Sequence, residues 1–308
     1  MCLRISGRMK TAIQLLAAMG FAVSAWGQAD LSGWPRVRIE VLALDARGDL
    51  STGLTPDILS LKEDGKAQMI AEVKPAAEAQ SVCLLIDASG SMWAREAAAQ
   101  YAAARLLRSL PAEDEVCVAD FSSKAYLDQD LTLDRKKDEK ALGFIKDSGG
   151  TALRTALVAI SDYLRKKAQN RSRAIILLSD GTDNASPADE AQMKRSMLVD
   201  GGVAVHVMCV PADPARAAQA RSDTNEKVAL RLTNMFGGLT YFPRNTADMN
   251  AAVDHLADAM KTRYVLTYEA SNSAKDGRER KIEVAFAKAL QNQRAVVRAP
   301  EGYYAPSQ

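Results

Sequence analysis

The chain has 308 residues, of which 47% are hydrophobic and 25% are charged, with 40 basic and 38 acidic side chains. This composition is that of an ordinary globular protein and excludes a disordered, collagen-like or disulfide-stapled chain. Because the charges nearly balance, there is no basic surplus for a phosphate backbone, and we expect no nucleic-acid partner.

Residues 1–27 have the layout of a secretory signal peptide. Arg4, Arg8 and Lys10 precede an apolar run at 12–23, and small residues follow it. An uncleaved membrane anchor is the alternative, although the apolar centre is short for a membrane span. We therefore expect a secreted or periplasmic protein that contacts a membrane only if this segment is retained.

Residues 28–79 are predicted to be rich in β-structure. Positions 36–44 alternate between polar and apolar side chains, as in a strand with one buried face. Two further short strands, at 60–62 and 68–73, flank Glu63-Asp64-Gly65, and this tripeptide is a hairpin turn signal.

Residues 80–270 alternate short apolar runs with helical segments. Strands are predicted at 82–86, 116–121, 174–178 and 203–210, with an edge strand at 126–131 and a last strand at 264–268. Helices are predicted at 93–110, at 151–169, from the Ser186-Pro187 start to Gly201-Gly202, at 226–236 and at 246–261, with further helix caps at Asp134 and Thr246. Strands that are apolar on both faces and alternate with helices predict a doubly wound α/β domain with a mostly parallel sheet.

Residues 271–308 return to a β pattern. The apolar side chains at 281–286 alternate, and 294–298 is the expected hairpin partner. Neither flank has enough strands to be stable alone, so we expect the two flanks to pack together as one small β-rich subdomain with the α/β domain inserted between them.

The cysteines downstream of residue 27 are Cys83, Cys117 and Cys209, and each lies inside an apolar run. A small hydrophobic side chain packs well there, so buried free thiols are expected. A bridge between Cys83 and Cys117 would require two neighbouring strands with the correct geometry.

Hydroxyl and carboxylate side chains follow the predicted parallel strands at their carboxyl ends. Asp87, Ser89 and Ser91 follow the first strand, Thr151 follows Gly149-Gly150 at a helix start, and Asp180 follows a later strand. Open α/β sheets bind ligands at this edge, and these hard oxygen donors suit Mg²⁺, Mn²⁺ or Ca²⁺ better than zinc. Each residue alone could serve as a cap or turn residue, but all five together favour a metal site.

This pattern resembles the metal-ion-dependent adhesion site of von Willebrand factor type A domains, over roughly residues 80–270. The flanking segments 53–57, 63–65, 264–268, 276–278 and 302–306 are similar to exported bacterial VWFA-related proteins, known especially from Acidobacteria. The resemblance implies that Ser89, Ser91 and, depending on state, Thr151 contact the cation, with Mg²⁺ foremost. It further implies that Asp87 and Asp180 act directly or through water, and that a carboxylate from a partner protein completes the coordination.

Four further residues have two interpretations each. Trp93, just beyond the motif, could present an aromatic surface to a partner or pack on its helix. Asp183 and Asn184 could shape the rim of the site, where Asp183 would contact the partner, or belong to a solvated loop. Asp120 lies in the second predicted strand, where an apolar residue would be easier to bury; it could turn toward the sheet edge or pair with a basic group.

The residues after the first strand disfavour the common enzyme classes. A phosphotransferase with an aspartyl nucleophile would carry a second acid where this chain has Ser89, and no glycine-rich nucleotide-binding fingerprint or P-loop is present. A serine hydrolase lacks a base, because neither His206 nor His255 is at a predicted strand end. We therefore expect a binding module that is not an enzyme and has no small-molecule cofactor. The alternative is a structural envelope component whose metal only stabilises the loops, and a hydrolase or phosphotransferase is less favoured.

Overall fold

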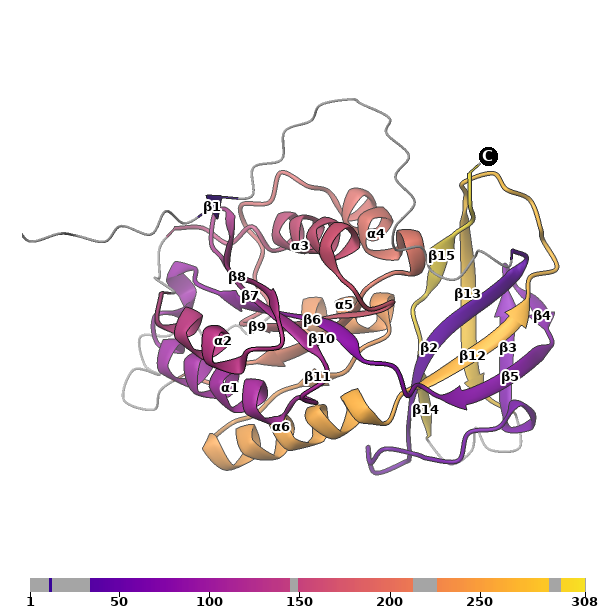
Figure 1. Ribbon diagram of the computed structural model, residues 1–308, viewed down its shortest axis with the longest axis horizontal. Coiled ribbons are helices and arrows are strands. Elements are labelled where there is room, and N and C mark those ends of the chain that lie inside the picture. The colour runs from indigo at the N-terminus through magenta and orange to yellow at the C-terminus, as the bar shows by residue number, and fades with distance from the viewer. Residues whose placement is uncertain (1–10, 13–33, 145–148, 213–225, 288–294, 308) are drawn as a thin grey trace, which may run out of the picture.

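The computed structural model describes residues 11–12, 34–144, 149–212, 226–287 and 295–307. Figure 1 shows a sheet surrounded by helices at one end of the molecule and a β-sandwich at the other. The predicted signal peptide lies outside the described residues except for Thr11–Ala12. In the described part of the chain, no helix is long and apolar enough to span a membrane.

The α/β domain is built on a central sheet that has the order β1-β8-β7-β6-β9-β10-β11 in the described part of the chain. Neighbours from β7 through β11 pair in parallel, whereas β8 is antiparallel to β7, and β1 is antiparallel to β8. The predicted mostly parallel α/β fold is therefore confirmed. Its strands are β1 (Thr11–Ala12), β6 (Gln80–Asp87), β7 (Glu115–Phe121), β8 (Ala125–Thr132), β9 (Ser172–Ser179), β10 (Ala204–Cys209) and β11 (Thr240–Tyr241).

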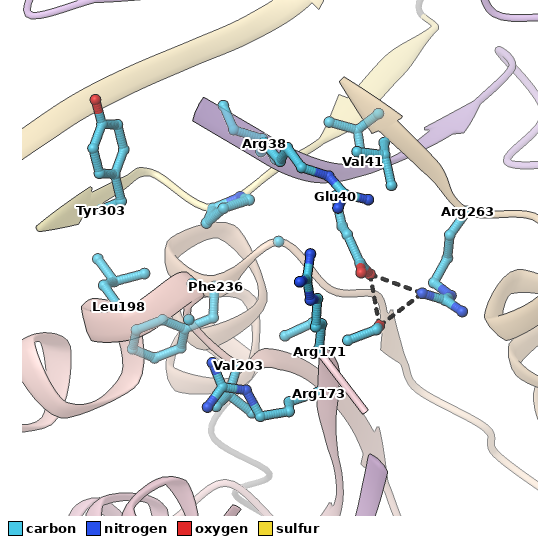
Figure 2. A pocket seen from close by; sticks show the side chains of 18 of the residues that line it. Arg38, Glu40, Val41, Arg171, Arg173, Leu198, Val203, Phe236, Arg263 and Tyr303 are labelled. Atoms are coloured by element: carbon cyan, nitrogen blue, oxygen red, sulfur yellow. Dashed lines mark hydrogen bonds and ion pairs between the residues drawn. The ribbon is translucent and has the colours of Figure 1, made fainter. Parts of the chain in front are cut away.

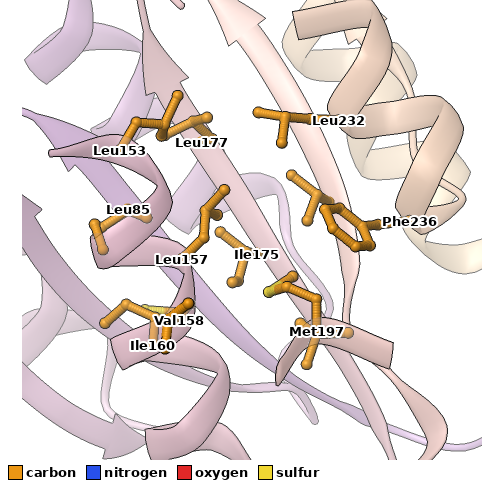
Figure 3. Close-up of a cluster of buried hydrophobic side chains, with 14 of the residues drawn as sticks. Leu85, Leu153, Leu157, Val158, Ile160, Ile175, Leu177, Met197, Leu232 and Phe236 are labelled. Atoms are coloured by element: carbon orange, nitrogen blue, oxygen red, sulfur yellow. The ribbon is translucent and has the colours of Figure 1, made fainter. Parts of the chain in front are cut away.

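Helices cover both faces of this sheet. They are α1 (Glu96–Ser109), α2 (Arg135–Ala141), α3 (Leu153–Lys167), α4 (Glu190–Leu198), α5 (Glu226–Phe236) and α6 (Thr246–Lys261). Leu84 points into the core under α1 and α6, whereas its neighbour Leu85 points into the core under α3, α4 and α5. Figure 3 shows this second core, in which Leu157 and Phe236 converge on the buried strand residue Ile175. A strand buried on both faces explains the unbroken apolar runs in the sequence.

The starts and caps of several helices differ from the sequence prediction. Residues 90–92 form a 3₁₀ turn, so α1 starts at Glu96 and not at Trp93. Helix α4 starts at Glu190 because Asp189 makes a capping box with Gln192, a stronger start than Ser186-Pro187. Asn245, not Thr246, caps α6, since its side chain accepts the Asp248 N–H. The predicted Asp134 cap of α2 is confirmed by a bond from the Lys136 N–H.

The two flanks form the β-sandwich. Its sheets have the orders β14-β2-β12-β5 and β15-β13-β3-β4 in the described residues. Their strands are β2 (Arg36–Leu44), β3 (Leu59–Glu63), β4 (Lys66–Gln68), β5 (Ile70–Pro75), β12 (Tyr264–Glu269), β13 (Glu279–Phe286), β14 (Val296–Arg298) and β15 (Gly302–Tyr304). Side chains from both sheets share one core, including Ile39, Leu61 and Leu266. The predicted turn at Asp64-Gly65 has positive φ at both residues and joins β3 to β4. The strand expected after it at 68–73 lies mostly in β5, which pairs with β12 in the other sheet.

Two further expectations about strand pairing were wrong. The segment 264–268 is not the last strand of the α/β domain, because β12 pairs antiparallel with β2 and β5 in the sandwich. The segment 294–298 is not the hairpin partner of β13, because β14 pairs with β2, and β13 pairs with β3 and β15. These pairings join residues far apart in the chain, which local patterns do not specify.

The three cysteines, Cys83, Cys117 and Cys209, are buried and free, as expected. Cys83 and Cys117 lie opposite each other on the neighbouring parallel strands β6 and β7. Burial raises the pKa of the Cys209 thiol to about 12, which keeps it protonated at neutral pH.

Candidate metal centre

The oxygen-rich residues predicted from the sequence lie at the carboxyl-terminal edge of the central sheet. Strand β6 ends at Asp87 and the adjacent parallel strand β9 ends at Ser179, directly before Asp180. The loop that carries Ser89 reaches the loop before α3, because the Gly90 N–H donates to the Gly149 carbonyl at 3.2 Å. Backbone pairing therefore fixes the relative positions of three segments that are distant in sequence.

Asp87 is the most buried acid of this group, with 2% of its surface exposed. One carboxylate oxygen accepts the Ser89 N–H at 2.9 Å, and the other accepts the Ser179 hydroxyl at 2.6 Å. Burial raises the pKa of Asp87 to about 6, and the charge of Asp180 adds to the effect although the two serines oppose it. A nearby cation would relieve this cost of burying negative charge.

Ser89 and Ser91 present their hydroxyl groups side by side, with 3.1 Å between the two Oγ atoms. Ser89 is buried, and Ser91 is half-buried in the 3₁₀ turn. The buried guanidinium of Arg95 supports this turn, since its Nη1 donates to the Ser91 carbonyl at 3.4 Å and its Nε to the Val210 carbonyl at 3.0 Å.

Thr182 connects the remaining two predicted residues. Its hydroxyl donates to Asp180 Oδ1 at 2.8 Å and lies 3.4 Å from the Thr151 hydroxyl oxygen. Both Thr151 and Asp180 are buried. Asn184 holds the backbone of Thr151 on both sides, because its side chain accepts the Thr151 N–H and its own N–H donates to the Thr151 carbonyl.

The rim residues differ in how far they are engaged. Trp93 is 46% exposed directly after the 3₁₀ turn. The Asp183 carboxylate has only 11% of its surface exposed, and it accepts the backbone N–H and Nε–H of Arg154 and the Ser186 N–H. Asp183 thus secures the first turn of α3. Asp120 is buried in β7 and lies beside Ile86 of β6.

Sequence reasoning did not assign Ser179 and Thr182 to the site, and it considered Asn184 only as a rim residue. Ser179 accepts the Gly181 N–H at 3.0 Å as well as donating to Asp87, so it ties the two strand ends together. Ser179 carried a weak signal, because it ends a strand next to Asp180. Thr182 carried none, and the only signal for Asn184 was its position shortly after Asp180, since such residues are common in surface loops.

The chemistry of the donor set fits a hard divalent cation. Within the described part of the chain, no three His, Cys, Asp or Glu side chains cluster as a metal-binding group. An ion at this edge would therefore depend on hydroxyl oxygens in addition to two carboxylates. Such oxygen sets suit Mg²⁺, Mn²⁺ and Ca²⁺, and the hydroxyl ligands leave the charge of the ion largely available.

Comparison with known proteins matches residues 82–182, about a third of the chain, to the family model of the von Willebrand factor type A domain. The chain is 28% identical over 181 residues to calcium-activated chloride channel regulator 1 of Equus caballus, a match that covers 56% of this chain and 18% of that protein. The chain thus spans about a fifth of the length of that relative.

The chain is also similar to two solved structures from other organisms. An aerotolerance-related membrane protein from Bacteroides fragilis has 19% identity and a TM-score of 0.48, covering 59% of this chain and 98% of its own. A von Willebrand factor type A protein from Catenulispora acidiphila has 15% identity and a TM-score of 0.47, covering 93% of this chain and 76% of its own.

Proposed function

Residues 82–182 match the von Willebrand factor type A domain. We therefore propose that the protein is an exported binding module that uses a divalent cation to bind an acidic side chain of a partner protein. The observation that carries this proposal is the cluster of buried oxygen donors at one sheet edge. The proposed ligands are Asp87, Ser89, Ser91, Thr151 and Asp180, with Mg²⁺ foremost and Mn²⁺ or Ca²⁺ as alternatives.

The arrangement of charge supports a site for an external carboxylate. The serine and threonine oxygens are neutral, so an ion held mainly by them stays electrophilic. Asp87 shares its two oxygens with a backbone N–H and the Ser179 hydroxyl, which favours a role through water over direct bidentate binding. A carboxylate from another protein would then fill the open coordination position.

The surroundings fit a protein partner. Trp93 exposes nearly half of its surface beside the 3₁₀ turn, and we propose it as a contact for the partner. Asp183 is proposed to act at the rim by holding the first turn of α3 against the site loop. The protein is proposed to act outside the cytoplasm, on the basis of the signal-like segment at residues 1–27, and to be neither an enzyme nor bound to a small-molecule cofactor.

The alternative function is a structural envelope component in which the ion only stabilises the loops. The raised pKa of the buried Asp87 is compatible with this alternative as well, because any bound cation would offset the burial of this acid. Both functions predict metal binding, and only the first predicts that partner binding requires the metal.

The two functions separate in one experiment with three proteins. Wild type, Asp87→Ala and the control Asp248→Ala, which alters an exposed acid on α6, are immobilised and exposed to envelope extract with Mg²⁺ or with EDTA. We expect partner capture only with Mg²⁺, and its loss in Asp87→Ala but not in Asp248→Ala.

Calorimetric titration with Mg²⁺ is run in parallel on the same proteins. Capture that persists in EDTA would contradict partner coordination while leaving the structural function. A wild-type protein that binds no Mg²⁺ would contradict both.

A further inference from the structure

A cavity of about 110 Å³ lies between the two domains, away from the candidate metal centre. Figure 2 shows its walls, which come from β2, β12 and β15 of the sandwich and from the beginnings of β9 and β10 in the α/β domain. Ser172 opens β9 and Ser179 closes it, so about 20 Å of strand separates this cavity from Asp87. The two sites are therefore distinct.

The charged residues around the cavity leave a surplus of positive charge. The lining has more arginines than glutamates. The arginines are Arg38, Arg171, Arg173 and Arg263, and the glutamates are Glu40 and Glu78. His206 adds no charge at neutral pH, because burial and the nearby Arg263 lower its pKa to about 4. The lining thus carries a formal excess of two positive charges, which favours an anionic ligand.

Two of these arginines are paired within the protein. Arg263 Nη1 donates to Glu40 at 2.9 Å and to the Ser172 hydroxyl at 2.7 Å, as the dashed lines in Figure 2 mark. Arg38 lies 3.8 Å from the Glu78 carboxylate. The other two arginines of the lining, Arg171 and Arg173, lie at the start of β9 or directly before it.

Of Arg171 and Arg173, only Arg173 is buried, with 7% of its surface exposed. Its Nη2 donates to the Asp200 carbonyl, but its Nε has no hydrogen-bond partner, and no carboxylate among the described residues forms an ion pair with it. Desolvation and the nearby Arg165 lower the pKa of Arg173, although the carboxylates of Asp200 and Glu40 oppose this shift. An anion in the cavity would give the buried Nε–H an acceptor.

The other half of the cavity is apolar. Figure 2 shows Arg173 running beside Val203 and Phe236, with Leu198 next to them and Tyr303 of the sandwich across the space. Pockets for drug-sized ligands measure roughly 300 Å³ or more, whereas about 10–15 Å³ holds one water, so this space of about 110 Å³ has room for roughly seven to eleven heavy atoms. A purely polar ion such as phosphate would leave the apolar wall without a contact.

We propose that this cavity binds a small organic carboxylate, whose charged group pairs with Arg173 and whose apolar part packs against Leu198, Phe236 and Tyr303. Because Arg173 belongs to the α/β domain and Tyr303 to the sandwich, the ligand contacts both domains at their junction. Bound ligand therefore stabilises the relative position of the two domains.

The test compares probes that differ in charge but not in shape. Benzoate, its neutral counterpart benzamide, and inorganic phosphate are titrated calorimetrically into the full chain. We expect benzoate to bind at least tenfold more tightly than either of the others. Equal binding of benzamide and benzoate, tighter binding of phosphate, or no binding of benzoate would each overturn the proposal.

Variants then assign the charge contact. Arg173→Gln should weaken benzoate binding at least tenfold, and Arg173→Lys should retain part of it. Arg47→Gln changes an 84% exposed arginine in the turn after β2, outside the lining of the cavity, and should change nothing. Asp87→Ala should bind benzoate as wild type does, so this result does not depend on the metal site. If a correctly folded Arg173→Gln protein binds benzoate like wild type, Arg173 is not the contact and the proposal is wrong. The probe comparison on wild type decides the case if that variant does not fold.

Discussion

Ser179 offers the sharpest test of how the candidate metal centre is built. Its hydroxyl donates to Asp87 at 2.6 Å and accepts the Gly181 N–H at 3.0 Å, so Ser179→Ala removes both bonds without touching a proposed ligand. Residues that orient metal ligands typically contribute 10–100-fold to affinity. We therefore expect Mg²⁺ to bind the variant 10–100-fold more weakly, which corresponds to about 1.4–2.7 kcal/mol.

The fold should lose stability as well. A hydrogen bond to a charged group contributes about 1.5–3 kcal/mol, and Asp87, whose pKa is about 6, is charged at pH 7.5, so we expect a loss within this range. Urea denaturation in EDTA measures this loss separately from metal binding.

The matched control is Ser161→Ala. Ser161 is equally buried and also makes two side-chain hydrogen bonds, but it lies in the middle of α3, away from the site. Calorimetric titration with Mg²⁺ at pH 7.5 should give wild-type affinity for this control. If Ser179→Ala binds Mg²⁺ as tightly as Ser161→Ala does, the bond to Asp87 does not position a metal ligand.

Three further predictions concern stability, each measured by urea denaturation. Between pH 6.5 and about 4 the unfolded chain takes up a proton at His206 while the folded protein does not, so the unfolding free energy should fall by about 3 kcal/mol as the pH drops through this range, and His206→Gln should remove that part of the pH dependence. A slope unchanged in the variant would contradict this assignment. Tyr268→Phe removes the hydroxyl that donates to the buried carboxylate of Glu63 and should cost about 1.5–3 kcal/mol. Tyr264→Phe removes a hydroxyl that accepts the Gly53 N–H and should cost about 1 kcal/mol. Equal losses would be inconsistent with a charged acceptor for Tyr268. Leu157→Ala should cost about 2–5 kcal/mol in the core of Figure 3, whereas the 62% exposed Leu133→Ala should cost under about 0.5 kcal/mol, and a small effect at Leu157 would mean that the core refills the space.

The positions of the site residues could be predicted because parallel strands share one polarity. Once 82–86 and 174–178 are recognised as neighbouring buried strands, Asp87 and Asp180 must emerge at the same edge. The roles of Thr182 and Asn184 could not be predicted in this way. Asn184 acts on Thr151, which lies 33 residues earlier, and only the folded loops bring the two together.

The sandwich was harder to predict than the α/β domain for a related reason. Strand β12 pairs with β2 across more than 200 residues, and nothing in its own sequence names that partner. Its position directly after α6 continued the alternation of helix and strand, which favoured the wrong sheet. Its buried side chains Leu266 and Tyr268 instead fill the space between the two sandwich sheets.

The inserted arrangement of the α/β domain has a mechanical consequence. Strand β2 enters the sandwich before the insertion, and β13 and β15 complete it afterwards. Tension applied between these two flanking segments would run through the interface of the sandwich sheets and bypass β6 and β9. The sheet edge that carries Asp87 would therefore keep its geometry while the sandwich resists the pull. A force applied through a partner bound at that edge would instead act on the α/β domain and would not follow the path between the two flanks.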